Sequence, residues 1–290
     1  MRELVSGDVG EGGHATTICQ ARQELQRKFH ARDLSLQEFE SKCGMRDPVD
    51  HPKRLETILV TGASRGIGLA LSKRLLQEEY RVIASYRSET PPETLSTLEN
   101  GNHRGSLTLL RMDVSEESAI SRARDLLSDQ FDHLDVLVNN AGWMPEGASD
   151  SLEDLDLDSF STAFAINVVA VARVTRALLP LLRRSRRARV LNLSSRAASI
   201  AMKENFNQYA YGTSKTALNM LTVTMANELR ADHIAVTAVS PGWVRTRMGG
   251  PNASLEPHES AESLARLIPK LSMEYSGEFY DRDGEEKLPW

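Results

Sequence analysis

The feature that most constrains the fold of this chain is an alternation of short apolar runs and longer amphipathic stretches, which begins at Leu55. Six runs have the composition of buried strands: TILVT (57–61), RVIAS (81–85), LTLLRM (107–112), DVLVN (135–139), RVLNLS (189–194) and IAVTAVS (234–240). Helical stretches lie between them, among them Ile67–Gln77, Glu116–Gln130, Phe160–Leu182 and Leu218–Arg230. Continuous apolar strands that alternate with helices are typical of a parallel sheet covered on both faces. With right-handed crossovers, the pattern predicts one Rossmann-type, doubly wound α/β domain of about seven strands, with a ligand crevice at their carboxyl ends.

Residues 1–53 do not follow this alternation, so we expect them to form an N-terminal extension to a domain that spans 54–290. The glycine-rich start is expected to be disordered, and the segment RDPVDHPKR (46–54) has the composition of a linker. Between them, Ile18, Leu25 and Phe29 recur at helical spacing, which predicts an amphipathic helix. Its role is open between a partly ordered extension, which we favour, and a helix that binds a partner.

Composition excludes several classes of function. A net charge of −5 and the absence of long apolar runs argue against nucleic-acid and membrane partners. The basic segment RRSRRAR (183–189) is typical of a solvated helix end. The N-terminus has no hydrophobic signal core, so we expect a cytoplasmic protein, in which Cys19 and Cys43 are free thiols. No cluster of histidine, cysteine and carboxylate has metal-ligand spacing, so we expect no metal.

A glycine-rich motif follows the first predicted strand directly. TGASRGIG (61–68) allows a tight turn at Gly62 and a close approach of backbone and ligand at Gly66 and Gly68. The helix that begins near Ile67 would direct its free N–H groups at a phosphate. The spacing G-x-x-x-G-x-G resembles that of the short-chain dehydrogenase/reductase family. This resemblance implies dinucleotide contacts along the loop, from Gly62, Ser64, Arg65, Gly66, Ile67 and Gly68.

The second predicted strand bears on the choice of cofactor. A carboxylate at its end would bind the ribose 2′-hydroxyl of NAD(H), whereas arginine accommodates the 2′-phosphate of NADP(H). Here Arg87 follows this strand and Arg65 lies in the glycine-rich loop, so two guanidinium groups flank one phosphate position. We therefore favour NADP(H) over NAD(H).

A tyrosine and a lysine in YAYGTSK (209–215) have the spacing of an acid/base pair on a helix. At about 100° per residue, Tyr211 and Lys215 lie about 40° apart on one helix face, whereas Tyr209 is about 240° from Lys215. A nearby ammonium favours the phenolate and so lowers the pKa of a tyrosine toward the useful range. A Tyr-x-x-x-Lys match alone is weak evidence, because short patterns recur by chance.

Further motifs strengthen the family resemblance. In VLNLSS, consecutive serines face opposite ways, so geometry leaves Ser194 and Ser195 open, and the family pattern points to Ser195 as the group that polarises a substrate carbonyl. Asn167 in FAINVVA resembles the family asparagine that holds a water in the proton relay. Hydride would pass from NADPH to a carbonyl carbon, Tyr211 would donate the proton, and Lys215 would lower the tyrosine pKa and bind the nicotinamide ribose. The other cofactor contacts that the family implies are Asp113, Val114, Asn140, Ala141, Gly142, Tyr211, Lys215, Pro241, Gly242, Val244 and Thr246, and Asn139 is expected to brace the sheet.

Within the family, AYGTSKTALNM, SPGWVRTRMGGPNASLEP and SGEFYDRDGEEKLPW resemble the sniffer/C-factor branch of carbonyl reductases and signalling-linked proteins. The resemblance implies an NADPH-dependent reductase of small-molecule carbonyls. The alternative is a signalling or regulatory protein that binds a dinucleotide with weak or no turnover. Relatives pair through two long helices, which leaves a homodimer or homotetramer open. The stripe Leu218, Leu221 and Met225 suits either such an interface or the core.

Overall fold

The computed structural model describes residues 55–101, 106–146, 151–203 and 208–290. By internal contacts the chain divides into two units, Met1–Arg54 and Leu55–Trp290. The predicted amphipathic helix and both cysteines belong to the first unit and lie outside the described residues.

The second unit is built on a sheet of seven strands with the order β3-β2-β1-β4-β5-β6-β7, and each adjacent pair is parallel. The strands are β1 (Thr57–Val60), β2 (Arg81–Tyr86), β3 (Ser106–Arg111), β4 (Val136–Asn139), β5 (Arg189–Leu193), β6 (Ala235–Ser240) and β7 (Phe279–Asp281). The first six coincide with the six predicted runs, and the chain order reverses between the neighbouring strands β1 and β4. The doubly wound fold is thus confirmed, and the carboxyl ends of β1 and β4 mark its ligand crevice.

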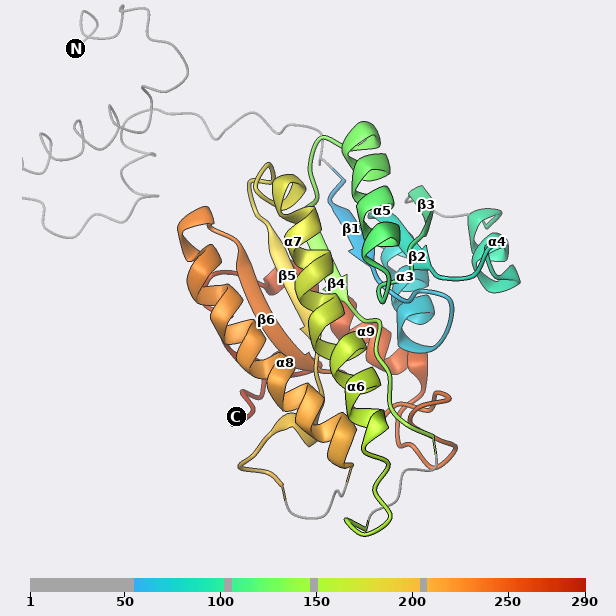
Figure 1. Ribbon diagram of the computed structural model, residues 1–290. Helices are drawn as coiled ribbons and strands as arrows, with labels where there is room; N and C mark the ends of the chain where they lie inside the picture. The colour runs from blue at the N-terminus through green and yellow to red at the C-terminus, as the bar shows by residue number, and fades with distance from the viewer. Residues whose placement is uncertain (1–54, 102–105, 147–150, 204–207) are drawn as a thin grey trace, which may run out of the picture. The chain divides into compact units, whose positions relative to one another are not determined.

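Helices cover both faces of this sheet (Figure 1). The helices α5 (Glu117–Gln130), α6 (Asp158–Phe164), α7 (Ala170–Leu182) and α8 (Tyr209–Glu228) lie on one face; α3 (Gly66–Gln77) and α9 (Pro257–Leu267) pack together on the other, and α4 (Glu93–Glu99) follows β2. The predicted helix over Phe160–Leu182 is interrupted by a π-helical turn at Ala165–Val169, which separates α6 from α7. Because α8 begins at Tyr209 rather than at Leu218, it carries the whole YAYGTSK segment.

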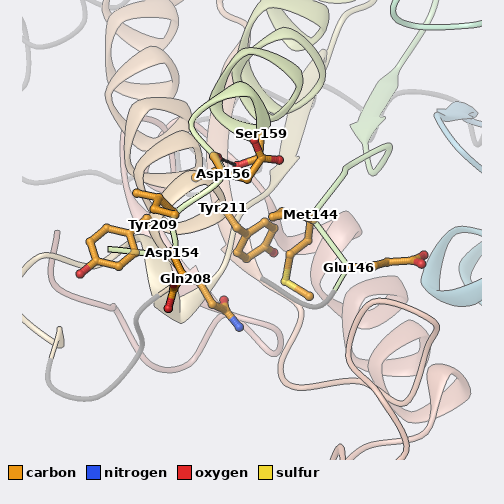
Figure 2. A pocket seen from close by; sticks show the side chains of 11 residues that line it. Met144, Glu146, Asp154, Asp156, Ser159, Gln208, Tyr209 and Tyr211 are labelled. Carbon is orange, nitrogen blue, oxygen red and sulfur yellow. Dashed lines mark hydrogen bonds between the residues drawn. The ribbon is translucent and has the colours of Figure 1, made fainter. Parts of the chain in front are cut away.

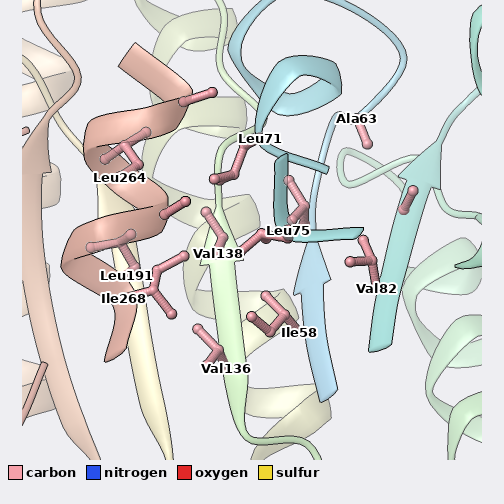
Figure 3. Close-up of a cluster of buried hydrophobic side chains, with 14 of the residues drawn as sticks. Ile58, Ala63, Leu71, Leu75, Val82, Val136, Val138, Leu191, Leu264 and Ile268 are labelled. Carbon is pink, nitrogen blue, oxygen red and sulfur yellow. The ribbon is translucent and has the colours of Figure 1, made fainter. Parts of the chain in front are cut away.

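Two apolar clusters hold the helices on the sheet. One contains Leu71, Leu75 and Leu264 from α3 and α9 against strand residues such as Val138 and Leu191 (Figure 3). The other lies under α5, α7 and α8 and includes Leu218 and Met225, with Leu221 packed against it. The stripe on α8 that suited either a core or an interface is therefore part of the core.

The helical segment Asp158–Leu182 has the length and the mean hydropathy, 1.6, of a membrane span. We expected no such segment from the sequence. Its apolar residues Val171, Val174 and Leu178 belong to the core cluster beneath the sheet, and 44% of its apolar window is buried within the domain.

Three arginines of RRSRRAR form ion pairs or hydrogen bonds within the domain. Arg189 is buried and pairs with Glu56, with 2.6 Å between Nη2 and Oε1. Arg187 donates to the carbonyl of Pro269 (2.6 Å), and Arg183 pairs with Asp232 (2.9 Å). The segment was expected to be a solvated helix end, and Arg189 departs from that expectation because it begins β5.

Candidate active site

The glycine-rich loop joins β1 to α3 and approaches the loop after β4 closely. Gly62 has a φ of +65°, and a Cβ at Gly68 would lie 2.5 Å from Asn140 Nδ2 and 2.6 Å from Gly62 O. Only glycine fits this approach. The N-cap residue of α3, Arg65, makes no side-chain cap, so the first N–H groups of this helix remain available to an anion.

A small hydrogen-bond network fixes the two loops that border the crevice. The Thr61 hydroxyl accepts from the backbone N–H groups of Asn140 and Ala141, at 3.0 Å each, and Asn140 Nδ2 donates to Thr61 O at 2.6 Å. Behind them, Asn139 Nδ2 donates to Asn192 Oδ1 of β5 at 2.9 Å. Asn139 thus bridges β4 and β5, in the bracing position predicted for it.

The residues expected at the adenine end of a dinucleotide lie at the edges of the same crevice. Arg65 and Arg87 are exposed, and the pKa of Arg65 is lowered, first by its partial burial and then by the charges of Arg247 and Arg87. The Asp113 carboxylate accepts from Ser115 N (2.9 Å) and Ser115 Oγ (2.7 Å), while Val114 packs against the core. Because Asp113 is bonded within its own turn, its side chain shapes the loop before α5.

Tyr211 and Ser195 meet at the carboxyl end of β5, close enough for the serine hydroxyl to favour the ionised form of the phenol. Ser195 Oγ also accepts from Ala197 N at 3.1 Å, which fixes its rotamer. The neighbouring Ser194 is buried and donates to Asn219 Oδ1 at 2.6 Å, away from Tyr211. The structure therefore separates the two serines, and Ser195 is the one beside the tyrosine.

Lys215 lies one turn after Tyr211 on α8, and its side chain is buried. Lys215 Nζ donates to the carbonyl oxygen of Leu193 at 2.7 Å and lies 5.8 Å from the centre of the Tyr211 ring. Burial lowers the pKa of Lys215 to about 8. Burial raises the pKa of Tyr211, and the hydrogen bond to Ser195 opposes that rise. The pKa of Tyr211 thus rises where a lowering was predicted, because burial of the phenol dominates the shift.

Asn167 lies in the π-helical turn between α6 and α7 and is fully buried. Its Oδ1 accepts from Trp143 N and its Nδ2 donates to Trp143 O, each at 2.8 Å, and Nδ2 also donates to Ser214 Oγ at 2.9 Å. Gly142 lies close to both Asn167 and Lys215, since a Cβ at this glycine would be 3.4 Å from Asn167 Oδ1 and 3.6 Å from Lys215 Nζ. Asn167 thus joins the loop after β4 to α8, and its water-holding role stays a prediction.

A cavity of about 160 Å³ opens beside Tyr211 (Figure 2). Figure 2 shows Tyr209 and Tyr211 pointing in opposite directions from the start of α8, as the helical geometry predicted. The described residues that line the cavity are Met144, Pro145, Glu146, Asp154, Leu155, Asp156, Ser159, Gln208, Tyr209, Ala210 and Tyr211. Tyr209 therefore lines the cavity but does not face Lys215.

The segment after β6 completes the border of the crevice. Pro241 and Gly242 turn the chain, and Val244 is buried in a short bridge to Leu255. Thr246 Oγ1 accepts from Gly249 N at 3.1 Å, and its methyl group lies 3.2 Å from the place of a Cβ at Gly66. The structure thus brings Thr246 onto the glycine-rich loop.

A family model described as short chain dehydrogenase matches residues 56–256. The chain belongs to the short-chain dehydrogenase family. The "C-signal" protein of Myxococcus xanthus is 41% identical over 157 residues, which cover 54% of this chain and 93% of that protein. The carbonyl reductase Sniffer of D. melanogaster is 30% identical over 82% of this chain and 100% of its own, with a TM-score of 0.76. An NADPH-bound carbonyl reductase from chicken fatty liver is 28% identical over the same shares, with a TM-score of 0.74.

The residues present in this short-chain dehydrogenase fit a dinucleotide. The close approach at Gly68, the uncapped start of α3 and the guanidinium groups of Arg65 and Arg87 form a cradle for phosphates. Within the described ranges, no three histidine, cysteine or carboxylate side chains are grouped in a way that holds a metal.

Several contacts of the site were not predicted from the sequence. The carbonyl of Leu193, the Trp143 backbone and the Ser214 hydroxyl all bond candidate residues. Leu193 and Trp143 act through backbone groups, for which a sequence carries no signal, and Ser214 was overlooked within YAYGTSK. Glu146 and Arg247, which pair at 3.5 Å, were also missed. The second basic residue in VRTRM was the available signal for Arg247.

Proposed function

We propose that this short-chain dehydrogenase is an NADP(H)-dependent oxidoreductase that reduces an aldehyde or ketone to an alcohol. The observation that carries the proposal is the placement of the Ser195 hydroxyl beside the Tyr211 phenol at the wall of a cavity, with Lys215 buried one turn further along the helix. A proton donor and a cation one turn apart on a helix, with a second hydroxyl beside the donor, suit a reaction in which a carbonyl oxygen gains a proton.

The roles of these residues follow from their contacts. The Ser195 hydroxyl donates to the substrate oxygen and polarises the carbonyl. Because burial raises the pKa of Tyr211, the phenol is protonated at neutral pH and can serve as the proton donor. Lys215, anchored on Leu193 O, supplies a positive charge next to the phenolate that forms. Asn167 holds the loop after β4 against α8. A bound nicotinamide supplies the hydride.

Two observations support NADP(H) as the cofactor. Arg65 and Arg87 are close enough for their charges to interact, and a 2′-phosphate carries about two negative charges at neutral pH. The similar chicken carbonyl reductase is described as NADPH-bound. We propose that Arg65 and Arg87 hold the 2′-phosphate and that the N-terminus of α3 receives the pyrophosphate.

The cavity beside Tyr211 suggests the charge of the substrate. Its described lining contains the carboxylates Glu146, Asp154 and Asp156 and neither lysine nor arginine. Like charges repel, so we propose a neutral or cationic carbonyl compound as substrate rather than an anionic one.

The experiment that tests the proposal is a screen of NADPH oxidation with aldehydes, ketones and quinones, repeated with NADH. Turnover that is faster with NADPH and is lost in Tyr211→Phe supports the proposal. No turnover with any carbonyl would reject the reductase, and a preference for NADH would reject the assigned role of Arg87.

The similarity to C-signal favours a second candidate, a dinucleotide-binding signalling protein with weak or no turnover. Tyr211→Phe distinguishes the two. If the cellular output of the gene needs turnover, the variant loses that output while it still binds cofactor. If the output depends on binding alone, the variant retains it.

A further inference from the structure

Three guanidinium groups from distant parts of the sequence converge beside the glycine-rich loop. Arg65 lies in that loop, Arg87 follows β2, and Arg247 lies in the segment after β6. Partial burial lowers the pKa of Arg65, and repulsion by Arg247 and then by Arg87 lowers it further. Convergence of like charges costs free energy in the cofactor-free protein, so an anion placed among them is stabilised.

The backbone around Arg247 is fixed close to this loop. The preceding residue, Thr246, has its methyl group 3.2 Å from the place of a Cβ at Gly66, in the first turn of α3. A hydrogen bond of 3.1 Å from Gly249 N to Thr246 Oγ1 and another of 2.9 Å from Gly250 N to Thr246 O hold this turn. The Arg247 side chain extends from the turn and is 62% exposed, so solvated ligands can reach it.

Glu146 is a carboxylate that contacts this cluster. Its Oε1 lies 3.5 Å from Arg247 Nε, and its negative charge partly offsets the lowering of the Arg65 pKa. Glu146 also lines the cavity beside Tyr211, yet Figure 2 shows its carboxylate pointing away from the Tyr211 ring. The pair therefore connects the substrate cavity to the arginine cluster.

Charge balance indicates what the cluster binds. Three guanidinium groups and one carboxylate leave two positive charges, which match a phosphate dianion. An exposed ion pair such as Glu146–Arg247 is weak, whereas guanidinium–phosphate pairs are charge-assisted and can be bidentate. A phosphate that enters the cluster is thus able to compete with Glu146 for Arg247.

We propose that Arg247 binds a phosphate of the dinucleotide together with Arg65 and Arg87, and that Glu146 pairs with Arg247 only until the phosphate displaces it. The inference rests on the proposed function, since it assumes that a dinucleotide binds in this crevice. Binding of the cofactor then frees the Glu146 carboxylate at the wall of the substrate cavity. Cofactor binding and the charge of that wall are thereby coupled.

The test is an equilibrium titration of the full chain with NADPH, followed by the fluorescence of the nicotinamide, at low and at moderate ionic strength. Arg247→Gln is expected to raise the Kd for NADPH about tenfold, since one charge-assisted contact is lost. Arg247→Lys keeps the charge without the planar fork and should give an intermediate Kd. Arg230→Gln, which removes an exposed arginine at the far end of α8, should bind NADPH as the unmodified chain does.

Glu146→Gln supplies the second arm of the test. It is expected to lower the Kd for NADPH about two- to fivefold, because an exposed competitor for Arg247 is removed. In the double variant with Arg247→Gln, this gain should disappear. If Glu146→Gln lowers the Kd for NADPH by the same factor in the double variant, Glu146 acts on the cofactor through its long-range charge rather than by pairing with Arg247. That result would overturn the proposed competition.

The outcomes separate this inference from the proposed function. If the unmodified chain binds no NADPH, the proposed function fails. If it binds NADPH and Arg247→Gln binds equally well, with an unchanged thermal unfolding midpoint, the role of Arg247 is overturned. A loss confined to NADPH would support binding at the 2′-phosphate together with Arg65 and Arg87, whereas equal losses with NADH and NADPH would overturn it.

Discussion

The side chains of Ser195 and Tyr211 lie beside each other at the junction of β5 and α8, where the serine hydroxyl favours the ionised phenol. The same junction is fixed a second time by Lys215, which donates to the carbonyl of Leu193, two residues before the serine. These contacts fix the position of α8 relative to β5, so the phenol, the hydroxyl and the ammonium keep their positions relative to one another. Pre-organisation of this kind lowers the cost of reaching a reactive geometry.

Removal of the hydroxyl group should lower kcat strongly at Tyr211 and only slightly at Tyr209, the two tyrosines of the segment YAYGTSK. Tyr211→Phe removes the proposed proton donor and is expected to lower kcat by about 10²- to 10⁴-fold while NADPH binding is retained. Tyr209 lines the cavity on the other side, so Tyr209→Phe should change KM modestly and leave kcat largely intact. Steady-state kinetics and cofactor titration measure both effects. Equal losses in the two variants would mean that the proposed acid is misassigned.

The two serines at the end of β5 should separate activity from stability. Ser195→Ala removes a donor to the reacting oxygen and is expected to lower kcat by about 10²- to 10³-fold, while loss of its bond from Ala197 N costs about 1 kcal/mol in stability. Ser194→Ala leaves the buried Asn219 Oδ1 without its donor, and Asn219 Nδ2 already has no partner among the described residues. The expected cost is about 1–3 kcal/mol in the free energy of unfolding, measured in urea. The reverse assignment of the two effects would contradict the observed geometry.

The buried ammonium of Lys215 should appear in the pH dependence of stability. Its pKa is about 8 in the folded chain against an ordinary value of 10.5. Because the unfolded chain binds the proton more tightly, folding is penalised fully below pH 8, and the penalty vanishes as the pH rises to 10.5. The unfolding free energy of the unmodified chain should therefore rise relative to Lys215→Met by about 3 kcal/mol over this range.

Urea denaturation at pH 7.5, 9 and 10.5 measures this difference. The exposed Lys270→Met serves as the control and should show a constant difference from the unmodified chain. A constant difference for Lys215→Met as well would mean that its ammonium is not destabilised by burial.

Much of the fold could be predicted because it depends on local patterns. The six long strands are continuous apolar runs, since both faces of a parallel sheet are covered, and their bounds agree with the structure within two residues. The shared face of Tyr211 and Lys215 follows from helical geometry alone. Motifs at strand ends could likewise be placed at one edge of the sheet, because parallel strands present their carboxyl ends together.

What escaped prediction depends on contacts between distant segments. The position of β7 was not predicted, because a run of three residues is too short to identify as a strand and its geometry depends on pairing with β6. The π-helical turn at Ala165–Val169 accompanies the bonds of Asn167 to Trp143 and Ser214 on other elements. The pKa of Tyr211 was expected to fall because the charge of Lys215 was weighed and the burial of the phenol was not.

The lining of the cavity leads to a prediction about substrate charge. Glu146, Asp154 and Asp156 line the space beside Tyr211, and Asp154 is exposed, so their field reaches an incoming substrate. A benzaldehyde with a para-carboxylate should therefore be reduced with a lower kcat/KM than its methyl ester, by roughly fivefold if the repulsion is about 1 kcal/mol. Asp154→Asn should narrow the gap, as should added salt, whereas Asp129→Asn on α5 should not. If both aldehydes react equally well at low ionic strength, the carboxylates do not select the substrate.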